Sequence, residues 1–522
     1  MPPIPTLHDI LPLLRPNGAR WASDWEVYRE GAFKAGNPGF VLDPERKRAL
    51  NWERSMRHVI ELGGTGEMKT SGAIMASILA QKEASIVCMD PSDEIYHETA
   101  MAKARDGYKI LCIKLSDLFR SLRHNFIAYT GKDPKKLSKL LNDLIVVELG
   151  IPKGNDKYWH INAKKVLTNA MNLLLTTPEE YHNLGNLNLI TSLMRPANRF
   201  RELNGLASRL SPQKYQKWLS FISQSERVLE YHISTAQACL EPFELEENCR
   251  LTSHSDFSFE ELRDPDQPAI LYISVNETEV QENRLFLSLF FSQLFDFALN
   301  NRFKKKRVSM TEEKPIRKLM VFFEEAGSIP IRNLPKIVST ARKREIALFL
   351  VIQDKSQLID IYHENGNTIF SGCKTRLYFG DPDVDMAKKI SDSLGKKEDK
   401  TMRQMIPLYE VNEIIRMTDT IMQTRGLYPI KFKMMPFFKV RKYRRKATPS
   451  PLFGIFPTEE EKFRYLDFKD FPELSPTAIT EADIIDPEQE RSEVSPALFL
   501  KPQMESARNQ GLSHLAHVPA SV

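Results

Sequence analysis

Short apolar runs alternate with segments of helical periodicity in the first part of the chain. An apolar run at residues 56–62 leads through a Gly-rich turn into residues 69–82, whose apolar positions have helical spacing. Two further apolar runs, 84–90 and 108–115, flank the helical segment 93–107. Because buried strands that alternate with helices form parallel sheets covered by helices, this pattern predicts an α/β fold.

The pattern changes from about residue 131 to residue 245, where strand signals nearly vanish. Segments 134–149, 161–175 and 212–224 keep the period of amphipathic helices. The alternation of strands and helices then returns, in segments 268–275, 283–301, 318–327, 334–344, 346–354 and 374–380. Together these segments predict one mostly parallel sheet that is interrupted by an all-helical domain.

The same patterns divide the chain into five parts. Residues 1–50 contain several prolines and predict an irregular lead-in, and residues 447–522 are rich in Pro, Ser and Glu without lasting periodicity, which predicts a flexible tail. The sheet domain is expected in two pieces, 51–130 and 246–446, with the helical insertion at 131–245 between them.

Charge is unevenly distributed between the body of the chain and this tail. The net charge is +5, but residues 448–522 carry 13 acidic and 6 basic groups, so that the first 447 residues have a net charge of +12. A basic body favours polyanionic partners, although a charge run can also be a solvated surface.

The sequence does not indicate a membrane-spanning, secreted, disulfide-rich or zinc-dependent protein. The longest apolar run, Leu285–Phe291, is far shorter than the roughly 18 residues of a membrane helix, and the N-terminus does not resemble a secretory signal. The five cysteines are scattered and no His-Glu-x-x-His occurs, so neither a disulfide framework nor a zinc hydrolase is indicated. We therefore expect a cytoplasmic protein.

The turn after the first apolar run nearly matches a phosphate-binding loop. Such a loop binds phosphate through backbone N–H groups at a helix N-terminus, a lysine near the terminal phosphates, and a hydroxyl on Mg²⁺. A tight turn entering a helix would explain the glycines equally well, and Met68 stands where the motif has glycine. The residues predicted to bind nucleotide are Gly63, Thr65, Gly66, Lys69, Thr70 and Ser71.

Polar residues also follow two later apolar strands. Glu324 and Glu325 follow one strand directly, an arrangement that suits a metal ligand and a group that orients the attacking water. Gln353 ends the next strand, where it can sense a γ-phosphate. Each of these three residues could instead be a solvated residue at the start of a loop without a function. Ligands of open α/β sheets nevertheless bind at such strand ends. The three features together favour a nucleoside-triphosphate site.

Long stretches of the chain resemble type IV coupling proteins of the TraG/TraD family, the ATPases that connect a DNA or protein substrate to a type IV secretion channel. The strings "IVCMDPSDEIYHETA" and "DGYKILCIKLSD" resemble the family's aspartate-proline segment, and residues 322–397 resemble its acidic and glutamine strands nearly end to end. Shorter landmarks are "RLTSHSDFSFEEL" and "GLYPIKFKMMPFF". The resemblance covers about residues 50–445.

This resemblance implies a RecA-like P-loop domain with ATP and Mg²⁺ as cofactors, and a homo-hexameric ring with ATP sites between subunits. It places the Gly-rich loop on the phosphates, Thr70 and Glu324 near Mg²⁺, Glu325 on the attacking water and Gln353 as the sensor. An arginine that reaches into the neighbouring site is expected at Arg342, with Arg344 as second choice. Asp90 and Glu94 match the aspartate-proline segment without an assigned role.

The implied partners are single-stranded DNA or a relaxase–DNA complex and the components of a type IV secretion channel. The basic clusters at 304–307 and 439–445, the second beside Phe437, Phe438 and Tyr443, could contact phosphates and stack on bases. Solvated loops are the alternative for both clusters.

The chain departs from the family pattern at four points. It has no membrane helix before the nucleotide domain, so that any peripheral position at the inner membrane would come through partners, and the aspartate-proline segment reads "DPSDE". Met68 and Glu324 lie in the catalytic apparatus, where we expect them to reduce ATP hydrolysis without abolishing it. The competing hypotheses are a catalytically weakened adaptor and a DNA-pumping ATPase unrelated to secretion.

Overall fold

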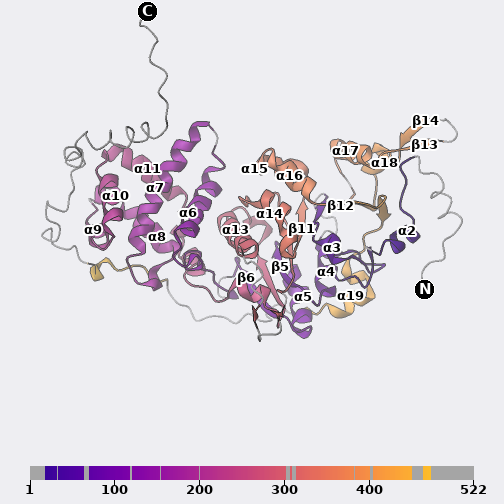
Figure 1. The fold of residues 1–522 in the computed structure, drawn as a ribbon, viewed down its shortest axis with the longest axis horizontal. Coiled ribbons are helices and arrows are strands. Elements are labelled where there is room, and N and C mark those ends of the chain that lie inside the picture. The colour runs from indigo at the N-terminus through magenta and orange to yellow at the C-terminus, as the bar shows by residue number, and fades with distance from the viewer. Residues whose placement is uncertain are drawn as a thin grey trace, which may run out of the picture.

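The protein was analysed as a computed structural model, in which a helical region stands at one end and a large sheet lies in the middle (Figure 1). The sheet domain extends to the opposite end through α17, α18 and α19. The described residues are 18–31, 33–63, 70–117, 120–152, 154–198, 200–300, 306–307, 313–314, 316–380, 382–399, 404–449 and 463–471.

The central sheet has nine strands in the order β16-β15-β12-β4-β11-β10-β5-β7-β6. Seven consecutive strands from β12 to β6 are parallel, whereas β15 and β16 are antiparallel at one edge. The prediction of a mostly parallel α/β sheet is therefore confirmed. The strands are β4 Val59–Leu62, β5 Ser85–Asp90, β6 Lys109–Lys114, β7 Ala269–Ser274, β10 Leu319–Phe323, β11 Ile346–Ile352, β12 Thr375–Tyr378, β15 Thr420–Thr424 and β16 Ile430–Phe432.

Both faces of this sheet are buried, because helices cover each of them. In β10, Val321 and Phe323 pack into one apolar core, while Met320 and Phe322 pack into another on the opposite face, as the alternation of side chains along a strand requires. The covering helices are α4 Met75–Ala80, α5 Glu94–Arg105, α13 Arg284–Asn300, α14 Leu334–Thr340, α15 Lys355–Tyr362, α16 Asn365–Gly372 and α19 Arg441–Lys446. Outside the sheet lie α17 Val384–Leu394, α18 Val411–Ile415, a three-stranded N-terminal sheet and two strand pairs. The pairs are β13 Lys396–Asp399 with β14 Gln404–Pro407, and β8 Lys306–Arg307 with β9 Glu313–Lys314.

The helical region interrupts the sheet between β6 and β7. It contains α6 Pro134–Leu149, α7 Lys157–Leu174, α8 Leu184–Leu193, α9 Arg201–Ala207, α10 Pro212–Ile222, α11 Glu226–Ala238 and α12 Glu246–Leu251. Their apolar faces, including Trp218 and Leu167, form a core that is continuous with one face of the sheet. The helices thus continue six residues beyond the predicted boundary at 245.

The N-terminal part differs from the predicted irregular lead-in. After α2 Asp24–Arg29, the strands β1 Phe33–Ala35, β2 Val41–Asp43 and β3 Arg48–Leu50 form a small antiparallel sheet that leads into α3 Trp52–Ser55. Phe40 is fully buried and makes edge contacts with Phe322 and Phe349 of the large sheet. This segment belongs to the core because its aromatic residues cover the face of β10 and β11.

A part of the predicted tail also has a defined place. Residues 463–471 lie against the helical region, and Phe463, Leu466 and Phe471 are buried there. The sequence predicts flexibility from 447 onward, because Pro, Ser and Glu are frequent there and the apolar residues show no lasting periodicity. Among the described residues, no helix combines the length and apolar character that crossing a membrane requires.

Candidate active site

Three strand ends meet at one edge of the sheet, and each carries residues that the sequence predicts to be functional. The strand β11 lies between β4 and β10, with Ile352 paired to Leu62 on one side and Leu350 paired to Phe323 on the other. The acidic strand β10 is therefore separated from β4 by β11, the strand that ends at Gln353. Parallel strands bring their carboxyl ends to the same edge.

Thr70 and Glu324 are in direct contact across this edge. The Thr70 hydroxyl donates a hydrogen bond of 2.5 Å to Glu324 Oε1. Thr70 begins a π-helical turn, Thr70–Ile74, that continues into α4, and Glu324 directly follows β10 and is 6% exposed. The predicted pair of metal ligands thus converges, although 254 residues separate the two positions in the chain.

Glu325 stands in a backbone conformation that few residues other than glycine adopt. Its φ is +54°, in the left-handed region, and the side chain is half-buried. Glu325 Oε2 accepts a hydrogen bond of 3.2 Å from the Ser328 hydroxyl. The next residue, Ala326, donates its N–H to the carbonyl of Val351 in β11, which holds the turn against the sheet. Such strain is often found at functional sites.

Gln353 is exposed at the end of β11, and its backbone N–H donates a hydrogen bond of 3.0 Å to Gln357 Oε1. Gln357 also covers Gly327, where an added Cβ would lie 2.4 Å from Gln357 Oε1. Gln357 therefore connects the glutamine strand with the acidic turn. Sequence reasoning missed this residue, although its i+4 spacing from Gln353 places it on the first turn of α15, beside the same edge.

Other predicted phosphate-binding residues are only partly described. Gly63 follows β4, and Ser71 is half-buried in the π-helical turn. Thr65, Gly66, Met68 and Lys69 lie outside the described residues. Gly72 is in close contact with Met434, whose Cγ would lie 2.8 Å from an added Cβ. The landmark "GLYPIKFKMMPFF" thus packs on the start of the helix that follows the loop.

Asp90 and Asp93 organise the neighbouring strand end. Asp90 is fully buried at the end of β5, and its Oδ2 accepts a hydrogen bond of 2.8 Å from the N–H of Tyr96 in the first turn of α5. Burial raises the pKa of Asp90 to about 7. Asp93 forms an ion pair with Lys114 and accepts a hydrogen bond of 2.9 Å from the Ser274 hydroxyl. The aspartate-proline segment therefore fixes the start of α5 against β5 and β7.

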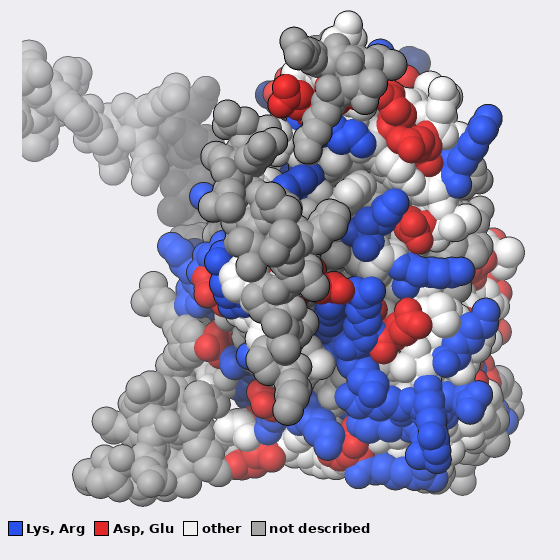
Figure 2. All heavy atoms as spheres, turned by 90° about the vertical axis from the view of Figure 1, so that its right-hand side faces the viewer, with Lys and Arg blue, Asp and Glu red and all other residues white. Residues whose placement is uncertain are grey.

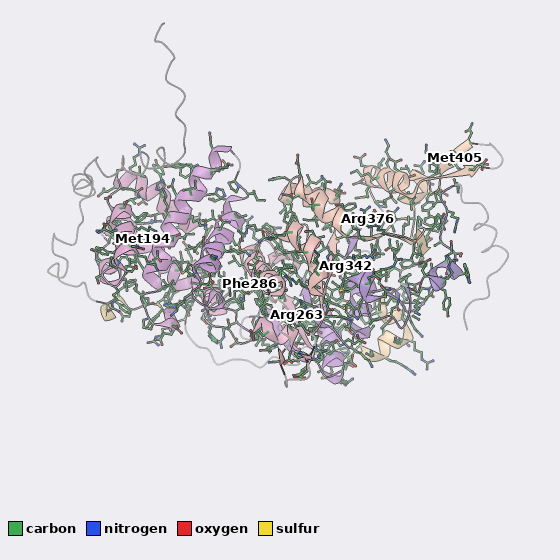
Figure 3. The ribbon with its side chains drawn as sticks, in the orientation of Figure 1. Met194, Arg263, Phe286, Arg342, Arg376 and Met405 are labelled. Atoms are coloured by element: carbon green, nitrogen blue, oxygen red, sulfur yellow. The ribbon has the colours of Figure 1, made fainter. Side chains whose placement is uncertain are left out.

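Arg342 lies at the opposite edge of the sheet from this site. It stands in the turn before β11, whereas Gln353 follows the same strand (Figure 3). Its guanidinium is exposed and lies 3.5 Å from Glu53, which precedes β4. Seven strand residues, a span of about 23 Å, separate it from Gln353. The structure therefore does not bring Arg342 to the site of its own chain.

Arg263 forms hydrogen bonds that fix the turn in which Arg342 and Arg344 lie. This side chain is 7% exposed and donates hydrogen bonds of 2.7 Å to the carbonyls of Arg317 and Arg344. The pKa of Arg263 is lowered to about 10, because burial disfavours its charge. Arg263 directly follows the landmark "RLTSHSDFSFEEL" and thus links it to the starts of β10 and β11.

A basic surface covers the end of the molecule at α19. Arg441, Lys442, Arg444 and Arg445 are exposed, and Figure 2 shows Lys and Arg side chains gathered on this face. The pKa of Lys442 is lowered by partial burial and then by the nearby charges of Lys47, Lys446 and Lys82. Such a concentration of positive charge attracts polyanions.

Among the aromatic residues predicted to stack on bases, only Phe438 is exposed, at 47%. Phe437 and Tyr443 are buried in the core beneath α19, so the prediction that they contact bases is wrong. Lys304 and Lys305 of the other predicted cluster lie outside the described residues, and only the backbone is described for Lys306 and Arg307.

The described part of the site suits a hard cation that keeps most of its water ligands. No group of three or more His, Cys, Asp or Glu side chains that could hold a metal occurs among the described residues. A hydroxyl and a carboxylate that meet at 2.5 Å nevertheless match the small number of protein ligands that Mg²⁺ takes beside phosphate. Thr70 and Glu324 therefore fit this ion.

The sheet order, the position of the loop after β4 and the acidic pair after β10 define a P-loop protein of the RecA-like class. Its family is shown by a family model, "Type IV secretory system Conjugative DNA transfer", which matches residues 17–405. The chain belongs to this family.

Solved structures of bacterial conjugative coupling proteins have the same fold. TrwBdeltaN70 in complex with sulphate is 15% identical, with a TM-score of 0.61 over 80% of this chain and 94% of that chain. TrwB in complex with ADP and Mg²⁺ is 16% identical, with the same TM-score and coverage. TrwB with the ATP analogue ADPNP is 16% identical, with a TM-score of 0.60 and the same coverage. A comparison with curated proteins finds no match.

Proposed function

We propose that the protein binds ATP with Mg²⁺ and hydrolyses it at the edge formed by β4, β11 and β10. The contact between Thr70 and Glu324 is the observation that carries this proposal, because it joins the end of the phosphate loop to the acidic strand. The crystallised TrwB proteins, which bind ADP and ADPNP in the same fold, support it.

Each residue of the site has a distinct role in this proposal. The loop from Gly63 to Lys69 and the hydroxyls of Thr70 and Ser71 hold the phosphates, and Thr70 and Glu324 hold Mg²⁺. When bound, this ion neutralises the charge that develops on the phosphate oxygens. Glu325 orients and deprotonates the attacking water. Gln353 senses the γ-phosphate, and Gln357 holds the backbone of Gln353 near the acidic turn.

ATP hydrolysis serves the transfer of DNA or nucleoprotein to a type IV secretion channel in this proposal. The membership in a conjugative DNA transfer family and the basic surface at α19 support it. The position of Arg342 at the opposite edge favours a ring, because an arginine that cannot reach its own site can act only on a neighbouring one. We propose a hexamer that meets the membrane through its partners.

A catalytically weakened adaptor is the alternative, and Met68 is the observation that favours it. A side chain in place of glycine disfavours the backbone conformation that directs amides to the β-phosphate. An adaptor would recruit the same substrates without moving them.

ATP turnover by the purified protein distinguishes these functions. We expect turnover that single-stranded DNA stimulates and that Lys69→Ala abolishes, and Met68→Gly is expected to increase it. Equal turnover in Lys69→Ala and the wild type, with substrate binding intact, would exclude the motor. Deletion of the gene, followed by complementation with either chain, tests whether conjugative transfer requires this turnover.

A further inference from the structure

Residues 463–471, here called the docking segment, lie on the helical region at the end far from α19. They follow the basic helix in the chain and stand outside the residues matched by the family model. The contact surface, here called the seat, consists of Tyr181, Gly185, Asn186, Glu246 and Cys249, from the turn before α8, from α8 and from α12.

The seat binds the backbone of the docking segment through two polar side chains. Asn186 is fully buried, and its Oδ1 accepts a hydrogen bond of 2.9 Å from the N–H of Leu466, while its Nδ2 lies 3.3 Å from the carbonyl of Arg464 and donates to it. Glu246 Oε1 accepts a hydrogen bond of 3.1 Å from the N–H of Phe463. One buried side-chain amide thus pairs with a backbone N–H and a backbone C=O of the docking segment, those of Leu466 and Arg464.

A space in the seat is shaped for the first aromatic residue. An added Cβ at Gly185 would lie 2.7 Å from Phe463 Cζ and 2.7 Å from Cys249 Sγ. A side chain at this position would therefore collide both with Cys249 of α12 and with the Phe463 ring, which is 8% exposed. Leu466, three residues later, is 4% exposed and is the second anchor.

Charged side chains hold the edges of the docking segment. Arg464 lies 2.7 Å from Glu180 and stands over the ring of Tyr181 at 5.1 Å. At the other end, the guanidinium of Arg209 stands 4.7 Å from the ring centre of Phe471. Both arginines are exposed, so that each contact contributes little affinity, but the contacts orient the peptide.

We propose that the seat is a peptide-binding site and that its ligand is the docking segment of the same chain. The site recognises a peptide with an aromatic residue followed three positions later by an aliphatic one, and it contacts backbone N–H and C=O groups of that peptide. Such a site is selective because Asn186 Oδ1 loses its hydrogen-bond partner when the peptide is absent, although Nδ2 keeps its hydrogen bond of 3.1 Å to the Tyr181 carbonyl.

The chain before the docking segment is attached to the sheet domain, and the acidic C-terminal residues follow the segment. Thr448 donates its N–H to the Glu98 carbonyl, and Lys446 donates to the Leu79 carbonyl, so that the chain before the docking segment is attached to the sheet domain. Thirteen residues, 450–462, join this attachment to the seat. Residues 472–522, which follow the docking segment in the chain, carry eight acidic and three basic groups.

A labelled synthetic peptide of residues 461–473 tests the proposal on the full-length protein. The double substitution Phe463→Ala and Leu466→Ala should release the chain's own segment, and the matched control Lys469→Ala, at an exposed position, should not. We expect the peptide to bind the released chain at least about tenfold more tightly than the wild type, in which the tethered segment competes. Equal binding to both chains overturns the proposal.

Two further measurements identify the site and the occupant. Adding Gly185→Ala to the released chain should abolish peptide binding, and binding that survives overturns the assignment of the seat. In the unmodified protein, hydrogen exchange should show protection of the Leu466 amide that does not change on dilution. Absence of protection, or protection that is lost on dilution because a second copy supplies the segment, also overturns the proposal.

Discussion

The Thr70 hydroxyl donates a hydrogen bond of 2.5 Å to the Glu324 carboxylate, and this contact joins two elements that are 254 residues apart in the chain. It requires the turn after β4 and the end of β10 to meet across the intervening strand β11. The contact fixes where the phosphate loop and the acidic turn stand relative to one another, and it is the reference point for the predictions that follow.

Removing the hydroxyl of this pair should impair the use of Mg²⁺. We expect Thr70→Ala to lower ATP turnover by at least about tenfold, since a group that orients or binds the metal is removed. Thr70→Ser keeps the hydroxyl and should retain most of the turnover. The measurement is the Mg²⁺ dependence of turnover for the three chains, and an unchanged dependence in Thr70→Ala would contradict the assignment.

Because Glu325 has a left-handed backbone conformation, replacing it by glycine should affect ATP turnover much more than the free energy of unfolding. Glu325→Gly should lower turnover about 10²-fold or more, because the general base is removed, while nucleotide binding remains. The free energy of unfolding should change by only about 1 kcal/mol, because relief of backbone strain offsets the added flexibility of glycine.

Lys132 provides a control for this substitution. Its φ is +61°, close to that of Glu325, but it is exposed in the turn before α6, in the helical region. Lys132→Gly should therefore change the unfolding free energy similarly and leave turnover unchanged. A comparable loss of turnover in both variants would show that backbone conformation alone explains the effect.

The position of Arg342 predicts complementation between inactive chains. Arg342→Ala and Glu325→Gln should each be inactive in a ring, but an equimolar mixture should recover about a quarter of the sites, where an intact Glu325 faces an intact Arg342 of a neighbour. Turnover is measured before and after mixing. Arg344→Ala should behave as wild type, and a mixture as inactive as its components would rule out an arginine acting between subunits.

His58 should make stability depend on pH. It is 1% exposed, its Nε2 lies 3.0 Å from the Val338 carbonyl, and burial lowers its pKa to about 4 from an ordinary value of about 6.5. The unfolded chain therefore binds a proton at a higher pH than the folded one. The contribution of His58 to stability is complete above pH 6.5 and decreases by about 3 kcal/mol as the pH falls to 4.

Comparison with a variant isolates this effect from other groups. His124, whose pKa burial also lowers to about 4, acts in the same direction, and Asp90, whose pKa is raised to about 7, acts in the opposite one. The difference between wild type and His58→Asn in denaturant titrations from pH 4 to pH 7 should therefore report His58 alone. A pH-independent difference would contradict the prediction, and His160→Asn, at a half-buried position in α7, serves as control.

The basic surface at α19 should contribute to DNA binding through charge. Replacing Arg441, Arg444 and Arg445 by Gln should weaken binding of single-stranded DNA and lower the dependence of log K on log salt by about 0.7 for each phosphate that is no longer neutralised. Lys214→Gln with Lys217→Gln, exposed on α10 at the other end of the molecule, should leave the slope unchanged. Equal slopes in all chains would exclude this surface.

The strands and the residues at their ends could be predicted from the sequence, because both depend on local patterns. A short apolar run such as residues 346–352 predicts a strand that is buried on both faces of a sheet. The polar residues that follow such a strand then lie at the edge of the sheet. The contribution of residues 33–50 to the core was missed, because its aromatic residues are too sparse to show a period. For the same reason the sequence pattern predicts Phe437 and Tyr443 at the surface, whereas both are buried.

The sequence by itself determined the α/β class, the helical insertion and the identities of Thr70, Glu324, Glu325 and Gln353 as a candidate set. Only the tertiary structure decided that β11 separates β4 from β10, that Gln357 connects the glutamine strand with the acidic turn, and that Arg342 lies at the opposite edge. It also decided that the docking segment meets Asn186. The reason is physical: strand order and packing between distant segments depend on the complementarity of surfaces far apart in the chain, which local periodicity does not encode.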